Sequence, residues 1–204
     1  MTRLPRLPFI LVATLAGQAA AQRPPASDGE TYRLAADSRL EIHVARAGLL
    51  AAAGHEHLIR ARVFEGSITY RPDDPTHAAV TVAVATRDLY VVPAADSADI
   101  PKITATMRNV VLKVDANPVI RFVSSAVVPA DRGVHVEGTL TMMGLARPVG
   151  FDAELQLSGD TLTGTATFSV RQSDFGIHPY STALGLVRVA DLVRFEIRLR
   201  GTRH

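Results

Sequence analysis

Two histidines stand at the spacing that a metal site can use in an extended strand. His55 and His57 flank Glu56, and alternate side chains of a β-strand project from the same face. Two imidazoles on one face can bind one zinc ion, but a site needs at least three protein ligands. His43 or His178 would have to supply a third ligand, and sequence spacing alone places neither near the pair. The other interpretations are two partly exposed polar side chains at the rim of the fold, or a pair that hydrogen-bonds the head group of a ligand.

No other group of residues carries a complete catalytic signature. Ser173, Asp174 and His178 lie close together in the sequence, but the Gly-x-Ser-x-Gly elbow of a serine hydrolase is absent. The chain has no Cys and no Gly-x-x-x-x-Gly-Lys phosphate loop, which excludes thiol chemistry and that mode of nucleotide binding. Arg147 and Arg171 could contact a phosphate or quinone head group, although exposed Arg more often forms ion pairs or holds loops together. We therefore expect no catalytic residue, no resident metal and no enzyme activity.

Strands account for most of the elements that must position these residues. Apolar and polar residues alternate in eight stretches, which is the pattern of strands with one buried face. The stretches cover residues 32–47, 57–70, 79–86, 119–128, 134–142, 149–157, 161–170 and 192–200. Gly144 permits a positive φ and Pro148 cannot donate to a central ladder, so we expect the turn between the fifth and sixth strands to lie between these two residues.

One amphipathic helix interrupts the strands. Ile103, Met107, Val110, Val111 and Val114 recur at helical spacing, and an Asn-Pro pair then ends the segment. Eight strands joined mostly by short turns predict an all-β chain, folded as a single antiparallel sandwich or closed barrel. An eight-stranded barrel has room inside for side chains or for one small ligand.

Composition and the N-terminal segment narrow the class of partner. The formal net charge is +2 and the basic residues are scattered, whereas a nucleic-acid surface clusters Lys and Arg, so we expect no nucleic-acid partner. Residues 1–21 combine basic residues, an apolar run and a small-residue end, which predicts a cleaved secretory signal peptide. Residues 22–30 are rich in Pro and polar residues and predict a flexible lead-in. About 180 residues remain, enough for one domain with a substantial core.

Four stretches of the chain, in the right order, resemble those of the YceI-like polyisoprenoid-binding proteins. Residues 138–149 resemble the hairpin Gly-x-Leu-Thr-x-x-Gly-x-x-Arg-Pro-Val of that family. Residues 117–125 resemble its Pro-x-Ile-x-Phe-x-Ser strand, and residues 171–177 its Arg-x-Asp-Phe-Gly-Ile connection. Residues 54–68 resemble its early Gly-His segment and the Gly-x-Ile strand that follows.

The resemblance implies a lipocalin-like, eight-stranded antiparallel barrel over residues 31–204, with one inserted α-helix and a long apolar cavity. It also implies export to the bacterial periplasm, binding of a polyprenyl or quinone-type chain, and no enzyme activity. No cofactor is expected apart from such a bound isoprenoid lipid or quinone. An isoprenoid or other long-chain lipid is the expected partner, with transient contact to a membrane, and the oligomeric state is left open.

The residues expected to contact this ligand share an inward apolar position on a strand. They are Ile42, Val82, Phe122, Leu140, Phe151, Phe168, Phe195 and Ile197. An isoprenoid chain offers no hydrogen-bonding groups along its length, so its affinity comes from burial of apolar area. His55 and His57 are the expected polar contacts to its head group. Two alternatives remain: a protein-interaction barrel whose core these residues fill, and a metal-binding protein or metal-assisted enzyme built on His55 and His57.

Overall fold

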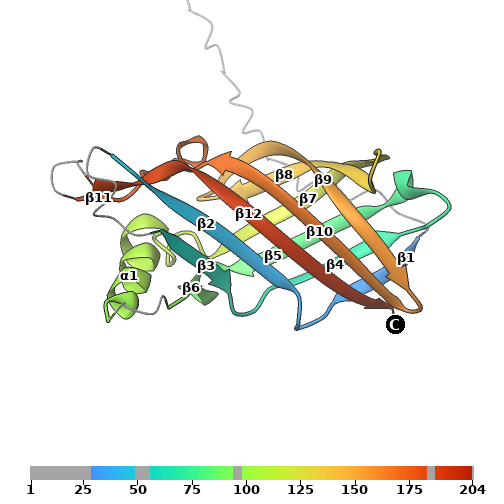
Figure 1. The fold of residues 1–204 in the computed structure, drawn as a ribbon, viewed down its shortest axis with the longest axis horizontal. Helices are drawn as coiled ribbons and strands as arrows, with labels where there is room; N and C mark the ends of the chain where they lie inside the picture. The colour runs from blue at the N-terminus through green and yellow to red at the C-terminus, as the bar shows by residue number, and fades with distance from the viewer. Residues whose placement is uncertain (1–28, 49–55, 94–97, 183–186, 204) are drawn as a thin grey trace, which may run out of the picture.

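The computed structural model describes residues 29–48, 56–93, 98–182 and 187–203. The expected signal peptide, nearly all of the expected lead-in and His55 lie outside these residues. Strands make up most of the described chain, as Figure 1 shows. The strands are β1 (Glu30–Leu34), β2 (Arg39–Ala47), β3 (His57–Ala61), β4 (Glu65–Tyr70), β5 (Ala79–Ala85), β6 (Leu89–Val91), β7 (Val119–Pro129), β8 (Val134–Met142), β9 (Leu145–Ser158), β10 (Thr161–Arg171), β11 (Ser181–Thr182) and β12 (Val187–Arg203). The helical segments are the short turns η2 (Pro75–His77), η3 (Thr86–Asp88) and η5 (Gln172–Phe175), the helix α1 (Ile100–Thr106) and the π-turn η4 (Met107–Val111).

Eight antiparallel strands close into a barrel. Around the wall the order is β1, β4, β5, β7, β8, β9, β10 and β12, and β1 pairs with β12 to complete the circle. The N-terminal part of β12 pairs instead with β2, and β3 and β6 extend the sheet from there. Helix α1 lies beside this extension, at one end of the barrel (Figure 1). The expected fold class is confirmed: an all-β, eight-stranded antiparallel barrel with a single α-helix among the described residues.

Alternation along the strands decides which side chains face the interior. On β12, Phe195 and Leu199 are buried, whereas Arg194, Glu196 and Arg198 between and before them are exposed. Apolar side chains are removed from water on one face, while charged side chains remain solvated on the other. The same alternation fixes the register, because a slip by one residue would turn every charged residue inward.

The β8–β9 hairpin turns earlier than the sequence predicts. Met143 and Gly144 form a two-residue turn with φ values of 52° and 73°, the positive values of a type I′ turn that matches the twist of the flanking strands. Leu145 already pairs with Met142, so Pro148 lies inside β9. The expected turn between Gly144 and Pro148 is therefore wrong, because a proline is accepted in a strand where its nitrogen has no partner.

The inserted helix is shorter than the periodicity predicts. After α1 the chain widens into the π-turn, in which the backbone nitrogen of Leu112 donates to the oxygen of Met107 (2.9 Å). Met107 is buried and Ile103 and Val111 pack against the core, whereas Val110 is exposed. The wider turn rotates Val110 out of the apolar stripe. Within the described ranges, no helix is long and apolar enough to cross a bilayer.

Side chains close the barrel at both ends. Phe175 and Ile177, which follow β10, are buried in the cluster that also holds the α1 region. At the opposite end, Tyr32 and Leu162 are fully buried. The hydroxyl of Tyr32 donates to the carboxylate of Glu30 (3.1 Å). Burial first, and then this contact, raise the pKa of Tyr32, which stays protonated and keeps donating.

Asp191 of β12 holds the η5 turn in place, and this gives a pH-dependent prediction. Its carboxylate accepts hydrogen bonds from the hydroxyl (2.7 Å) and the backbone nitrogen (2.8 Å) of Ser173, which lower the pKa of Asp191. Because the folded pKa lies below the unfolded value, the stabilisation is present above about pH 4 and is lost as the pH falls through the folded pKa. We expect Asp191→Ala to melt roughly 2–6 °C below the wild type at pH 7.

Thermal unfolding followed by circular dichroism at pH 7 and pH 3 measures this effect. The difference between wild type and Asp191→Ala should shrink at pH 3, because this pH lies below the ordinary pKa of an Asp in the unfolded chain and the stabilisation falls from there downward. Asp73→Ala is the control, because Asp73 is exposed and its carboxylate lies 3.9 Å from Nε of Arg71, at the outer limit of an ion pair. A melting difference for Asp191→Ala that is the same at both pH values would contradict the assigned role.

Candidate functional site

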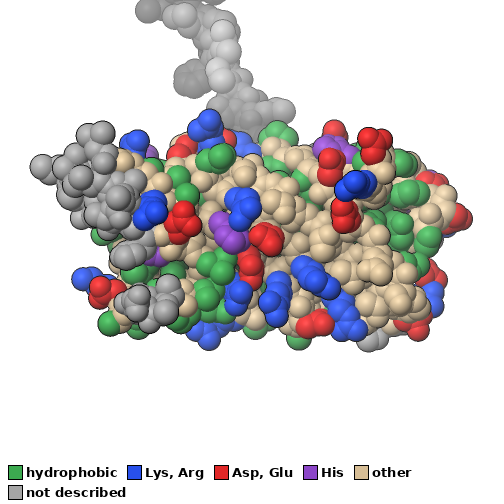
Figure 2. Space-filling model, in the orientation of Figure 1, with side chains coloured by type: hydrophobic (Ala, Val, Ile, Leu, Met, Phe, Trp, Pro, Cys, Tyr) green, Lys and Arg blue, Asp and Glu red, His purple; other side chains and the backbone are tan. Residues whose placement is uncertain are grey.

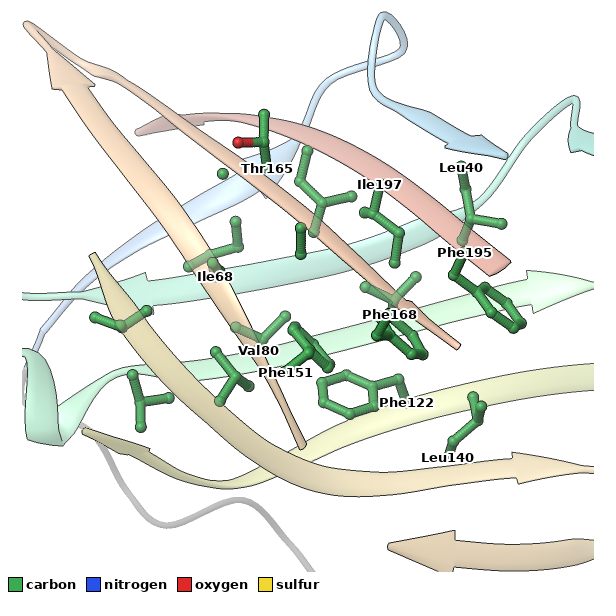
Figure 3. Close-up of a pocket in the computed structure, with 18 of the residues that line it drawn as sticks. Leu40, Ile68, Val80, Phe122, Leu140, Phe151, Thr165, Phe168, Phe195 and Ile197 are labelled. Atoms are coloured by element: carbon green, nitrogen blue, oxygen red, sulfur yellow. The ribbon is translucent and has the colours of Figure 1, made fainter. Parts of the chain in front are cut away.

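The barrel encloses an apolar cavity of about 100 Å³ (Figure 3). All eight apolar residues predicted to bind a ligand line it: Ile42, Val82, Phe122, Leu140, Phe151, Phe168, Phe195 and Ile197. They come from six strands of the barrel wall and from β2 beside it, so the cavity is formed by many strands rather than by one hairpin. An apolar cavity of about 150 Å³ in another protein stays dry and binds benzene, so a void of this size and lining can take a short length of hydrocarbon. That these residues contact a ligand remains a prediction.

Four phenylalanine rings form a row on the inner wall, visible in Figure 3. Phe151 of β9 stacks on Phe168 of β10 with ring centroids 4.6 Å apart, and Phe168 stacks on Phe195 of β12 at 5.0 Å. Phe122 of β7 tilts by 47° against Phe151 at 5.5 Å. Ring pairs at these separations attract one another beyond the area they bury. The row therefore narrows the cavity at this level and holds the four strands in register.

Gly138 of β8 makes room for the aromatic row. A Cβ atom at this position would lie 2.5 Å from Cζ of Phe122 and 2.6 Å from the backbone oxygen of Val123. Only a residue without a side chain fits beneath the ring. Because β8 lies between β7 and β9, Gly138 lets the ring of Phe122 cross the intervening strand and reach Phe151.

Small inward residues, rather than large ones, create the empty part of the cavity. Ala153 of β9 and Gly164 and Ala166 of β10 line it, and Ala153 lies directly opposite Ala166. The ligand contacts predicted from the sequence are all large apolar side chains and do not include these three residues. The sequence feature that could have found them is a small residue at an inward position of a strand. On β10, Gly164 and Ala166 lie at such positions, on the same face as Phe168.

The cavity offers almost nothing polar. Among its lining residues only Tyr70 and Thr165 carry a polar side-chain atom, and none carries a charge. A buried polar group without a partner costs about 1–3 kcal/mol, whereas a hydrocarbon chain loses no hydrogen bond on entering. The lining therefore suits hydrocarbon and holds no His, Asp, Glu, Lys or Arg side chain for acid–base chemistry.

The histidines of the described chain do not converge. His57 lies opposite Val44 on the neighbouring strand, which places it on the inner face, in a groove beside α1 rather than in the apolar cavity. His43 is on the outer face, with Nε2 3.2 Å from a carboxylate oxygen of Glu196, and His178 is exposed. The other member of the predicted pair, His55, lies outside the described residues. Within those residues no three His, Asp or Glu side chains gather as metal ligands would.

Arg147 and Arg171, for which the sequence favours a structural role over a head-group contact, hold loops. Nε of Arg147 donates to the backbone oxygen of Asp174 (2.8 Å), which joins β9 to the η5 turn. Arg171 lies 3.8 Å from the carboxylate of Asp191. The hydroxyl of Ser173 donates to the same carboxylate and so forms part of this connection. These contacts agree with the structural interpretation of both arginines.

Comparison with known proteins gives one family. The model of the YceI-like domain matches residues 35–200. No curated protein matches the chain. Among solved structures, BcnA of Burkholderia cenocepacia is 19% identical with a TM-score of 0.66, covering 82% of this chain and 98% of that one. A polyisoprenoid binding domain from Saccharophagus degradans, described as implicated in plant cell wall breakdown, is 12% identical with a TM-score of 0.60, covering 86% and 99%. The YCEI protein of Campylobacter jejuni is 14% identical with a TM-score of 0.58, covering 72% and 84%.

Proposed function

The chain belongs to the YceI-like domain family, and from this premise we propose that it binds the hydrocarbon chain of an isoprenoid lipid inside its barrel. The observation that carries the proposal is the apolar cavity, whose lining includes no charged side chain. A similar fold in a protein described as a polyisoprenoid binding domain supports this class of ligand. The role is to carry or store the lipid, without catalysis.

Burial of apolar area supplies the affinity. At about 0.8 kcal/mol per buried carbon, one five-carbon isoprene unit contributes roughly 4 kcal/mol before the cost of ordering the chain. The present void of about 100 Å³ accepts only a short part of a polyprenyl or quinone tail. A longer tail enters when the phenylalanine row changes rotamers and opens the narrow level of the cavity.

The two alternatives gain less support from the geometry. A barrel with a filled core would leave no void among its inward side chains, whereas this interior keeps one beside Ala153 and Ala166. A metal site on the described histidines would need His43 and His57 on one face, and the register of β2 and β3 puts them on opposite faces. We further propose that the protein works in the periplasm after removal of residues 1–21, which is supported by the order of basic, apolar and small residues there.

Mass spectrometry of protein made in a Gram-negative host and purified from the periplasm tests this proposal. The intact mass should correspond to a chain that begins at Gln22. An organic extract should contain a polyprenyl or quinone-type lipid at close to one molecule per protein. Ala166→Phe, purified in parallel, is the control, because its side chain occupies the cavity. The binding proposal fails if the wild-type extract holds no more lipid than that of the variant.

A further inference from the structure

The polar end of a bound lipid has no place inside the cavity. Only Tyr70 and Thr165 among the lining residues carry a polar side-chain atom. A hydroxyl, phenol or quinone head group enclosed there would leave most of its hydrogen bonds unmade. The head group must therefore lie where the cavity meets solvent, and the described part of the chain offers a place that fits.

The hydrogen-bond ladder of the barrel wall breaks between two neighbouring strands. β9 and β10 pair as far as the rung of Ala153 and Ala166 and no further. Beyond it, residues 145–152 of β9 pair only with β8, and residues 167–171 of β10 pair only with β12. We call the boundary between residues 145–152 and residues 167–171 the seam.

At the seam, β9 has an edge without a partner strand, and Pro148 suits such an edge. Met142 and Leu145 form the hydrogen-bonded pair that closes the hairpin. Hydrogen-bonded and non-hydrogen-bonded pairs alternate along the ladder from there, so Pro148 occupies a non-hydrogen-bonded position toward β8. Its nitrogen therefore faces the seam, where a partner strand would need an N–H that proline lacks. On the inner side only side chains close the seam, because the rings of Phe151 and Phe168 stack across it.

A polar groove of about 1010 Å³ lies on the outside of the barrel where the seam begins. Four residues line both this groove and the inner cavity: Ala153, Thr165, Ala166 and Ile197. Three further grooves of the described chain each share at most one residue with the cavity. Of these grooves, the polar one shares the most lining residues with the cavity, and it does so at the rung where the ladder stops.

Resting on the proposed function, we propose that the seam is the entrance for the lipid tail and that the outer groove holds the head group. The tail passes between β9 and β10 just beyond the last rung, as the rings of Phe151 and Phe168 separate. The head group stays outside against Thr165 and Thr167, which both line the groove and whose hydroxyls donate and accept hydrogen bonds.

The charges of the groove select an uncharged head group. Three arginines face five carboxylates, which leaves an excess of two negative charges. Arg39 lies directly opposite Arg198, and Glu41 directly opposite Glu196, so a pair of arginines and a pair of carboxylates lie next to each other across β2 and β12, and both signs occur on this face in Figure 2. The carboxylates outnumber the arginines, and Asp152 of the groove adds repulsion for an isoprenyl phosphate at the seam. An isoprenoid alcohol, phenol or quinone meets no such penalty.

A disulfide staple tests the entrance, because the chain has no Cys of its own. Extension of the β9–β10 register by one rung places position 152 opposite position 167. We expect oxidised Asp152→Cys/Thr167→Cys protein, stripped of lipid, to take up the fluorescent isoprenoid alcohol retinol at least about tenfold more slowly than the same protein reduced. Gln156→Cys/Thr163→Cys is the matched control, since this pair already lies within the ladder, and its oxidation should not change the rate. Equal rates for the oxidised and reduced seam pair overturn the proposal.

A second variant covers the seam without a disulfide. Thr167→Trp should slow retinol uptake relative to Thr163→Trp, which places the same ring on the same strand away from the groove. Uptake at the same rate in both variants counts against the seam.

Competition measures the choice of head group. Geranylgeraniol should displace retinol at an about tenfold lower concentration than geranylgeranyl phosphate, and equal potency overturns the assignment of the groove. If the stripped wild type binds neither retinol nor geranylgeraniol, the proposed function itself has failed. If the protein binds retinol normally and the disulfide does not change the rate of uptake, only the proposed entrance is ruled out.

Discussion

Ala166→Phe should lose isoprenoid binding while the barrel remains folded. Ala166 lies on the cavity wall opposite Ala153, so a benzyl side chain there projects into a void of about 100 Å³ and fills most of it. A hydrocarbon chain then has neither the space nor the apolar contact on which its affinity depends. Loss of a single isoprene unit from the site removes roughly 4 kcal/mol, so we expect the Kd for retinol to rise at least about 100-fold.

Thermal unfolding separates lost binding from lost folding in this variant. A forced fit in a packed core would cost about 1–3 kcal/mol, whereas a side chain that fills a void adds burial, so Tm should move by less than roughly 5 °C. Thr163→Phe is the control, because Thr163 pairs with the exposed Arg200 and stays outside the cavity. Fluorescence titration with retinol gives both affinities. Wild-type affinity in a folded Ala166→Phe protein would show that the ligand binds elsewhere.

Gly138→Ala should destabilise the barrel strongly although it adds only one methyl group. That methyl would meet the Phe122 ring at 2.5 Å and the backbone oxygen of Val123 at 2.6 Å. The ring can move only by leaving its contact with Phe151, and the oxygen belongs to the neighbouring strand and moves only if the strand does. Overpacking of this kind and loss of the ring contact together predict a fall in Tm of roughly 6–15 °C.

Gly150→Ala is the matched control for this effect. Gly150 lies on β9 one rung away, opposite Glu137. An added Cβ there would come closest to the tip of the His135 side chain, 3.1 Å from Nε2, with backbone no nearer than 3.9 Å. A side-chain tip can give way, and alanine loses less backbone entropy than glycine on folding. We expect Tm to change by no more than about 2 °C. Equal melting temperatures for the two variants would mean that the aromatic row does not depend on Gly138.

Alternation along single strands was enough to predict the inner wall of the barrel. The alternation within a single strand already predicts that Phe122, Leu140 and Phe195 face the interior, because a pleated strand sends every second side chain to the same face. All eight predicted wall residues line one cavity for this reason. The hairpin at residues 134–157 was equally local, although its turn fell at Met143 and Gly144 because a two-residue turn with positive φ values suits the strand twist.

Pairing between strands distant in the sequence decided the rest. Whether an inward position is filled or empty depends on what the opposite wall contributes, so the space beside Ala153 and Ala166 follows from packing between strands and not from either strand alone. Whether His43 and His57 lie on the same face of the sheet depends on the β2–β3 register, which no single strand determines. The place where the β9–β10 ladder stops is likewise a property of a pair of strands.

The sequence by itself therefore determined the class of fold, the inward faces and the apolar character of the interior, because these follow from the period of a strand and from the cost of burying charge. Only the tertiary structure decided where the interior is hollow, where the ladder of its wall stops and which polar residues lie beside that point. Those properties arise from the summed volumes and hydrogen bonds of several strands. No single stretch of the chain contains them.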